Sequence, residues 1–142
     1  MIKEKSAGAV VFRKDNEIKY LLLYRKAKLH YKESWDFPKG KIEEEDEKET
    51  IKREILEETG INDVRIIPSF KEKISYFYKK ESKLISKEVV YYLVETKEEK
   101  VNISYEHDGY KWANYNEAIK LLTFDNAKNI LKKADNFLIK GR

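Results

Sequence analysis

The sequence predicts an α/β protein of the α+β type, in which helices pack on a mixed β-sheet. Apolar runs bounded by polar turns indicate strands, and one segment carries the signals that start and stop a helix. The elements follow in the order strands, helix, further strands and closing helices. The chain has 142 residues, of which 41% are hydrophobic and 39% are charged, so it can bury a core. No repeat or linker divides it, and we expect a single domain over residues 1–142.

The strands are predicted from runs of apolar and alternating residues. They cover residues 6–13, 18–24, 35–37, 64–67, 71–78, 88–95 and 109–113. Helices are predicted over residues 47–59, 116–122 and 126–139. The first helix has clear ends, because Asp46 followed by Glu49 is a helix-start pattern and Gly60 suits the left-handed residue after the last turn.

Composition excludes several classes of protein. The absence of cysteine excludes disulfides, thiolate metal sites and cysteine nucleophiles. No apolar run is long enough to span a membrane, and the first residues lack the apolar core of a signal peptide, so we expect a cytoplasmic protein without a membrane partner. The net charge of +4 comes from scattered lysines, which do not indicate a stable nucleic-acid partner. The sequence is compatible with a monomer or a homodimer.

Three acidic residues in the segment "REILEETG" lie on one side of the first helix. Glu54, Glu57 and Glu58 have the spacing i, i+3 and i+4, and each like-charge pair costs about 0.2–0.5 kcal/mol on a helix. A charged helical face is ordinarily solvated. Here, however, the acids border the apolar stripe of Ile51 and Ile55, and no lysine shares their side of the helix. Oxygen clusters of this kind bind hard divalent cations, so the sequence predicts a metal site.

The segment "WDFPKGK" leads into this helix. Pro38 and Gly40 predict a tight loop that exposes its backbone. Lys39 and Lys41 flank the glycine and offer positive charges to phosphate oxygens. Loop, lysines and acidic helix together predict a site for a phosphate and a metal.

These residues resemble the Nudix box, whose pattern is G-x5-E-x7-R-E-U-x-E-E-x-G-U, where U is a bulky aliphatic residue. The second half, residues 53–61, matches fully, and Gly40 matches the opening glycine. The middle is one residue short, so that either Glu45 or Asp46 takes the first acidic position. The resemblance implies an α/β/α sandwich around a mixed sheet, with the box as loop, helix and loop. It also implies hydrolysis of a nucleoside diphosphate linked to another group.

The same resemblance implies the roles of particular residues. Glu54, Glu57 and Glu58 would be metal ligands for Mg²⁺ or Mn²⁺, and the Gly40 carbonyl would join them. Arg53 would orient Glu57. These five residues form the expected catalytic and metal-binding set within the box.

Outside the box, the chain is similar to a narrower group, the diadenosine tetraphosphate hydrolases. The segments that carry this likeness are "SAGAVVFR", "FKEKISY", "VVYYLVET" and, above all, "SYEHDGYKW" over residues 104–112. The resemblance implies that Glu106 is a further metal ligand or the general base. It also implies that Tyr76 lies near an adenine, with Phe124 placed to cover the other face of the ring. Tyr78 shares a strand face with Tyr76 and could line the same cleft.

Other polar residues have competing interpretations. His107 could be a proton shuttle, although a structural histidine is favoured, and His30 is left open. Arg25, Lys26 and Lys28 could line a polyphosphate path, but a surface role is favoured.

Three functions are therefore compared. The first is asymmetric hydrolysis of diadenosine tetraphosphate to ATP and AMP, with a small nucleotide as the partner. The second is hydrolysis of a nucleoside triphosphate, a nucleotide sugar or an RNA 5′ end, because the box handles only the diphosphate. The third is a nucleotide-sensing module without turnover, which the intact "REILEE" opposes.

Overall fold

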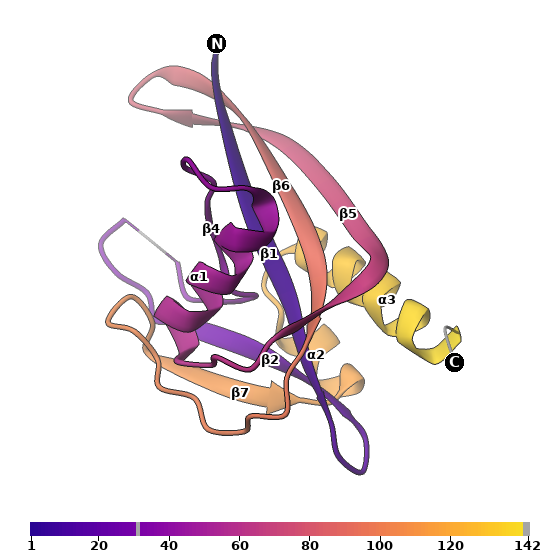
Figure 1. Ribbon diagram of the computed structural model, residues 1–142. Coiled ribbons are helices and arrows are strands. Elements are labelled where there is room, and N and C mark those ends of the chain that lie inside the picture. Colours follow the sequence, from indigo (N-terminus) through magenta and orange to yellow (C-terminus); the bar gives the residue numbers. More distant parts are fainter. Residues whose placement is uncertain (31, 141–142) are drawn as a thin grey trace.

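The computed structural model describes residues 1–30 and 32–140. Figure 1 shows strands and helices in the order β1 (Ile2–Lys14), β2 (Ile18–Arg25), β3 (Ser34–Asp36), β4 (Lys39–Lys41), α1 (Glu47–Thr59), β5 (Arg65–Lys80), β6 (Lys83–Glu95), β7 (Gly109–Ala113), α2 (Tyr115–Leu121) and α3 (Asp125–Lys140). In this part of the chain no helix is both long and apolar enough to span a membrane.

The described strands form one seven-stranded sheet. The strand order is β3-β2-β1-β6-β5, with β4 paired to β1 and β7 paired to β2. The long pairing of β1 with β6 is parallel, whereas β1 with β2, β2 with β7 and β5 with β6 are antiparallel. The sheet is therefore mixed, as predicted.

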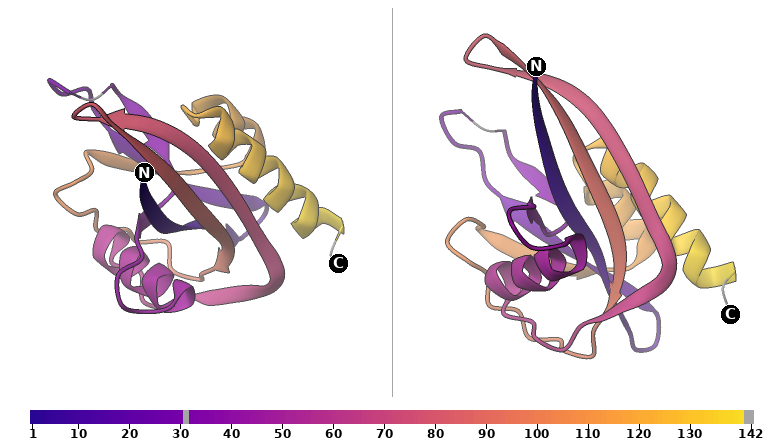
Figure 2. Two further views of the ribbon diagram at one scale, coloured as in Figure 1. Left: turned by 90° about the horizontal axis from the view of Figure 1, so that it is seen from above. Right: turned by 45° about the horizontal axis from the view of Figure 1, so that its top comes forward.

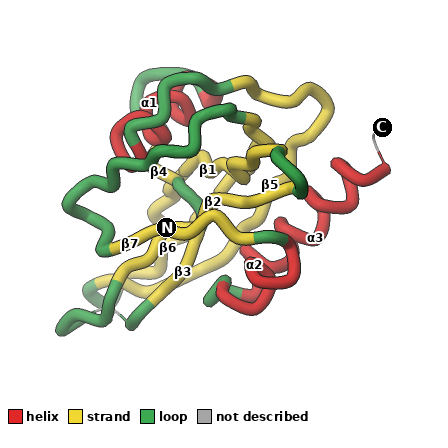
Figure 3. The backbone as a smooth tube through the Cα atoms, turned by 90° about the horizontal axis from the view of Figure 1, so that it is seen from below, coloured by secondary structure: helices red, strands yellow, loops and turns green. Residues whose placement is uncertain are grey.

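The helices cover both faces of the sheet, as Figures 2 and 3 show. One core lies between the sheet and α1, where Ile51 and Ile55 of α1 are buried. A second core lies between the sheet and the other two helices, where Ile130 and Leu131 of α3 are buried. The predicted α/β/α sandwich is confirmed.

Four strands, β1, β4, β5 and β6, differ in length or number from the prediction. Strands β1 and β6 begin at Ile2 and Lys83 because they continue beyond the core with β5 as a long ribbon, which projects from the body of the molecule in Figure 1. The hairpin between β5 and β6 turns at Glu81 and Ser82, whose φ values are 53° and 65°. This is the pattern of a type I′ turn, although neither residue is glycine.

Strand β5 is continuous where two strands were predicted. Its pairing with β6 shifts register between Ile66 and Lys71, and Ser69 within this bulge has a φ of 71°. The bulge accommodates Pro68, which cannot donate a hydrogen bond to the sheet. Strand β4 was predicted as part of a loop, yet it pairs with residues Ser6–Gly8 of β1.

The predicted ends of α1 are confirmed. The Asp46 side chain accepts a hydrogen bond from the Glu49 amide at 2.8 Å, and Gly60 follows the helix with a φ of 74°. Helix α1 is thus held in one position between β4 and β5, and its acidic side faces β4.

Candidate active site

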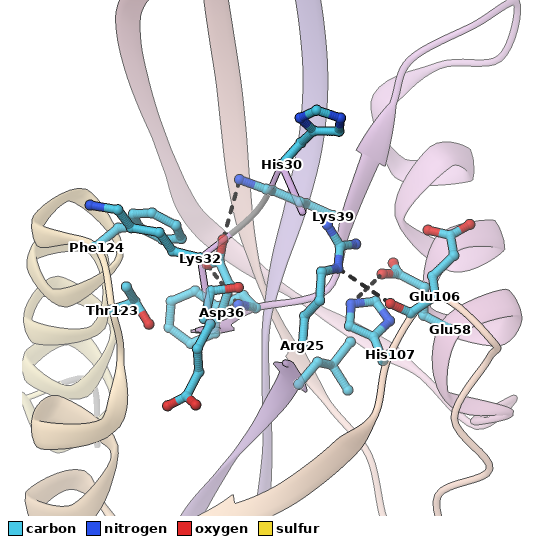
Figure 4. Close-up of a pocket in the computed structure, with 14 residues that line it drawn as sticks. Arg25, His30, Lys32, Asp36, Lys39, Glu58, Glu106, His107, Thr123 and Phe124 are labelled. Atoms are coloured by element: carbon cyan, nitrogen blue, oxygen red, sulfur yellow. Dashed lines mark hydrogen bonds and ion pairs between the residues drawn. The ribbon is translucent and has the colours of Figure 1, made fainter. Parts of the chain in front are cut away.

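A cleft of about 500 Å³ lies where α1, β3, β4 and the segment before β7 meet. Figure 4 shows side chains from these distant parts of the chain facing one another across it. Four predicted site residues line the cleft: Lys39, Glu58, Glu106 and Phe124. The acidic residues lie on one side and Phe124 lies on the other (Figure 4).

Glu58 is the most buried acid of the site. Its residue is 6% exposed, and its Oε2 atom finds no hydrogen-bond partner among the described residues. Burial, together with the nearby carboxyl groups of Glu54 and Glu106, raises the pKa of Glu58 to about 9. Burial also raises the pKa of Glu54. Two adjoining carboxyl groups with raised pKa values ionise more readily when a cation lies beside them, so this pair favours cation binding.

Gly40 is required by the position of Glu54. A Cβ atom at residue 40 would stand 2.0 Å from the Cδ atom of Glu54, which is far inside van der Waals contact. The Glu54 carboxyl group therefore lies directly on the backbone of β4. Any larger residue at position 40 would push Glu54 out of the site.

Arg53 connects the acidic residues of the box. Its Nη1 atom donates to Glu54 Oε1 at 2.9 Å and to Glu57 Oε2 at 3.2 Å, and its Nη2 atom donates to Glu45 Oε1 at 2.8 Å. The two candidates for the first acidic position of the box therefore have different contacts. Glu45 pairs with Arg53, whereas Asp46 caps α1. The guanidinium of Arg53 lowers the pKa of Glu45.

Glu106 and His107 approach Glu58 from the segment before β7. Glu106 is exposed and lines the cleft. The His107 Nε2 atom lies 3.7 Å from Glu58 Oε1, and its Nδ1 atom is buried without a partner among the described residues. Burial lowers the pKa of His107, so the imidazole is neutral at physiological pH.

The donor set fits a hard divalent cation. The partnerless oxygen of Glu58 and the raised pKa of both buried acids fit a site at which a cation would stabilise the ionised carboxylates. Within residues 1–30 and 32–140, however, no three acidic or histidine side chains form a ready-made metal cluster. Glu57 is exposed and both of its oxygens lie on Arg53. Mg²⁺ commonly binds to one or two carboxylates together with substrate phosphates. Glu54 and Glu58 are therefore enough protein ligands for such a site.

Basic side chains also line the cleft, and the Nε atom of Arg25 donates a hydrogen bond to the Glu106 carbonyl at 3.3 Å. Arg25, His30 and Lys32 line it together with Lys39, whose Nζ atom lies 3.3 Å from Asp36 Oδ2. The sequence favoured a surface role for Arg25, but in the structure Arg25 lines the cleft. The cleft thus brings acidic and basic side chains together, which suits a polyphosphate and its cation.

A second cavity of about 300 Å³ adjoins the cleft. Tyr76 and Phe124 both line it, as predicted for a base-binding site, and Tyr91 and Ile74 contribute further lining. Phe124, Asp36 and Lys39 line both spaces, so the cavity and the cleft are neighbours.

Two predicted substrate-binding residues lie outside both spaces. The Lys41 Nζ atom lies 3.5 Å from Glu4 Oε2, and the Tyr78 hydroxyl donates to Glu4 Oε1. That hydrogen bond raises the pKa of Tyr78 to about 12. The Tyr78 ring lies 6.3 Å from that of Tyr76, centroid to centroid.

Sequence reasoning missed Lys87, a lysine of β6 that is partly buried. It forms no ion pair with a described residue, and burial, with Lys39 and Lys41 nearby, lowers the pKa of its ammonium group. The signal was present in the sequence, because residue 87 shares a strand face with Val89 and Tyr91, which are buried. Lys87 lines neither the cleft nor the cavity, but its charge lies near those of Lys39 and Lys41.

Comparison with known proteins identifies relatives of similar length. A family model described as NUDIX domain matches residues 3–134. The asymmetrical bis(5′-nucleosyl)-tetraphosphatase of Rattus norvegicus is 33% identical over 146 residues, covering 94% of this chain and 95% of that protein. The C. elegans Ap4A hydrolase in a binary complex superposes with a TM-score of 0.80 at 32% identity, covering 96% of this chain and 98% of that chain. The RNA pyrophosphohydrolase of Sulfurovum sp. (strain NBC37-1) is 31% identical over 119 residues and 76% of each chain.

Proposed function

Because the chain belongs to the Nudix family, we propose that it hydrolyses dinucleoside polyphosphates and cleaves diadenosine tetraphosphate asymmetrically to ATP and AMP. The observation that carries this proposal is the base-sized cavity beside an acid-lined cleft, joined through Lys39. The near full-length similarity to the rat and nematode enzymes supports it. The whole chain would act as one domain, and a protein without cysteine that acts on nucleotides fits a cytoplasmic location.

The proposed reaction adds one water molecule across a phosphoanhydride bond. The water oxygen bonds to a phosphorus atom, the bridging P–O bond breaks, and the leaving phosphate keeps the bridging oxygen. One proton leaves the attacking water. A carboxylate among Glu54, Glu58 and Glu106 accepts it, since these groups face the cleft or adjoin it.

The acidic residues would also hold the metal on which Nudix hydrolases generally depend. Glu54, Glu57, Glu58 and Glu106 supply carboxylates, and the Gly40 carbonyl supplies a further oxygen. When bound, Mg²⁺ or Mn²⁺ offsets the charge of the phosphate oxygens and acidifies a water molecule. Arg53 holds the carboxylates of Glu54 and Glu57 in place before the substrate arrives.

The opposite side of the site would bind the nucleotide. Tyr76 and Phe124 stack on the two faces of one base, a contact that depends on shape more than on hydrogen bonds. Lys39 supplies positive charge to the phosphates, and Lys41 and Lys87, which lie outside both spaces, add to the positive potential around it. Because the Tyr78 hydroxyl is bound to Glu4, Tyr78 contributes through its ring beside Tyr76.

A substrate panel tests the proposal. The purified protein is incubated with diadenosine tetraphosphate, ATP, a nucleotide sugar and 5′-triphosphorylated RNA, each with Mg²⁺, with Mn²⁺ and with EDTA. We expect the first substrate to give ATP and AMP in equal amounts, only in the presence of metal. Release of ADP alone would contradict asymmetric cleavage. Reaction in ¹⁸O-labelled water assigns the attacked phosphorus, because one of the two products carries the label.

A second candidate function is hydrolysis at an RNA 5′ end. It is favoured by the similarity to the Sulfurovum RNA pyrophosphohydrolase, which covers less of the chain than that to the rat enzyme. Faster turnover of triphosphorylated RNA than of diadenosine tetraphosphate would select it. A lack of metal-dependent turnover on every substrate would instead indicate a nucleotide-sensing module.

A further inference from the structure

The base-sized cavity beside the cleft presents one amide that is not engaged elsewhere. Of its polar lining groups, Asp36 accepts a hydrogen bond from the Phe37 amide at 2.8 Å and lies 3.3 Å from Lys39. Asn126 also lines the cavity, and its side chain has no hydrogen bond or ion pair with the described residues. Its carboxamide therefore keeps one acceptor and two donors available to a ligand.

Asn126 is fixed relative to the aromatic ring of the cavity. It lies in the first turn of α3, next to Ala127, which is 2% exposed and anchors the helix to the sheet. The Phe124 carbonyl accepts a hydrogen bond from the Lys128 amide at 3.0 Å, so Phe124 and Asn126 belong to the same helix start. A base that stacks on Phe124 would therefore present an edge toward Asn126 in a reproducible position.

We propose that Asn126 is a specificity-determining residue that reads the edge of the bound base and favours adenine. This inference rests on the proposed function, which places a base between Tyr76 and Phe124. Stacking alone accepts any base, because every base has an aromatic face. Discrimination needs a polar group at the edge of the ring, and Asn126 offers one that combines an acceptor with two donors and has no partner among the described residues.

The chemistry of the amide suits adenine. Adenine presents an N6–H donor beside an acceptor, N1 or N7, and an asparagine side chain pairs with such an edge through two hydrogen bonds. A carboxylate at the same position has only acceptors. It would lose one bond to adenine and place its charge against the ring nitrogen, whereas guanine offers two adjacent donors, N1–H and N2–H.

The test is the Asn126→Asp variant, with Asn129→Asp as the matched control. Asn129 lies one turn further along α3, is exposed and lines neither the cleft nor the cavity, so its substitution adds the same charge outside the site. An aspartate near a helix start is also favourable for the helix, so both variants should fold. Diadenosine and diguanosine tetraphosphate are hydrolysed in one mixture, and kcat/KM is measured for each.

We expect Asn126→Asp to lower the adenine-to-guanine ratio of kcat/KM by about tenfold or more, and Asn129→Asp to leave it unchanged. An unchanged ratio in Asn126→Asp, with wild-type protein active on diadenosine tetraphosphate, would overturn this proposal and leave the proposed function intact. If wild-type protein hydrolyses neither compound, the proposed function fails. Calorimetric binding of ATP and GTP to both variants then tests Asn126 alone, and an equal effect of both substitutions on the ATP-to-GTP ratio overturns the assignment.

Discussion

The two walls of the site are built by the chain in different ways. The acid wall is residues 53–58 of α1, where the proposed metal-binding side chains follow one another within two helical turns. The base wall consists of Tyr76, Tyr91, Phe124 and Asn126. It is assembled from β5, β6 and the start of α3, which meet only in the folded sheet. A local motif specifies the acid wall, whereas the topology specifies the base wall.

The walls also differ in how they affect stability. In the base wall only Tyr91 packs as ordinary core, with 2% of it exposed and Phe37 in an edge-to-face contact at 6.2 Å, whereas Phe124 is 48% exposed. The acid wall buries Glu58 without a partner for one of its oxygens among the described residues. An unsatisfied buried polar group costs about 1–3 kcal/mol, so Glu58 opposes folding, and binding of the proposed cation would offset this cost.

The largest expected effect is the loss of turnover in Glu57→Gln or Glu58→Gln. We expect kcat/KM for diadenosine tetraphosphate to fall by at least about 1000-fold, because each variant removes a proposed metal ligand or base. Circular dichroism should show an unchanged fold. Glu49→Gln on the exposed first turn of α1 is the control and should keep wild-type activity. Full activity in both site variants would remove the acid wall from the mechanism.

The second effect concerns how the acid wall is held. Arg53→Lys replaces a planar fork that reaches Glu45, Glu54 and Glu57 with a single ammonium group. We expect kcat to fall by about 10- to 100-fold, with a smaller change in KM. Arg65→Lys is the matched control, because Arg65 is an exposed residue of β5 that pairs with Glu95 of β6, away from the site. Equal effects of the two substitutions would show that Arg53 has no positioning role.

The third effect tests the base wall. Tyr76→Ala removes one of the two proposed stacking rings, and we expect KM to rise by about 5- to 100-fold with a smaller change in kcat. Phe77→Ala is its control, since Phe77 is the next residue of β5, points to the opposite face and is 63% exposed. A fall in kcat with an unchanged KM in Tyr76→Ala would contradict a stacking role.

The smallest effect is on the stability of the metal-free protein. Because burial raises the pKa of Glu58 to about 9 from an ordinary 4.5, the folded protein binds more protons than the unfolded chain between these values. The free energy of unfolding should therefore fall as pH rises from about 5 to about 9, by up to about 1.4 kcal/mol per pH unit. Urea unfolding in EDTA measures this slope.

Glu58→Gln should flatten that slope and make the metal-free protein more stable at pH 8. Metal should stabilise the wild-type protein more at pH 8 than at pH 6, because protons compete with the cation for the carboxylates. A wild-type slope that Glu58→Gln leaves unchanged would mean that other groups titrate on unfolding.

The sequence was sufficient for the acid wall because its determinants are local. The spacing of Glu54 and Glu58, the cap at Asp46 and the glycine at residue 60 act within one helix, and the structure has all of them. The sandwich likewise followed from the element order and the box. The sequence left open whether Glu45 or Asp46 takes the first acidic position, because this depends on which of them Arg53 contacts in the folded protein.

The base wall and the phosphate side could be predicted only in part. Tyr76 and Phe124 were expected to line one cavity. The hydrogen bond from the Tyr78 hydroxyl to Glu4 was not predictable, because it depends on the pairing of β1 with β6. Asn126 was missed because its neighbours in the cavity come from other strands, and Lys87 was missed because the strand was predicted to begin at residue 88. Strand β4 was missed because three residues of "KGK" carry no periodicity, and β1 imposes the pairing.

The parallel pairing of β1 with β6 has a consequence for how the protein is made. Ile2 pairs with Ile85 and Phe12 with Glu95. The central strand β1 therefore cannot form this pairing until β6 has been synthesised. Long-range pairing of this kind slows folding. On the ribosome, α1 can form early, but it has no completed sheet to pack on until β6 has emerged from the exit tunnel. We expect nascent chains that end before β6 to remain protease-sensitive.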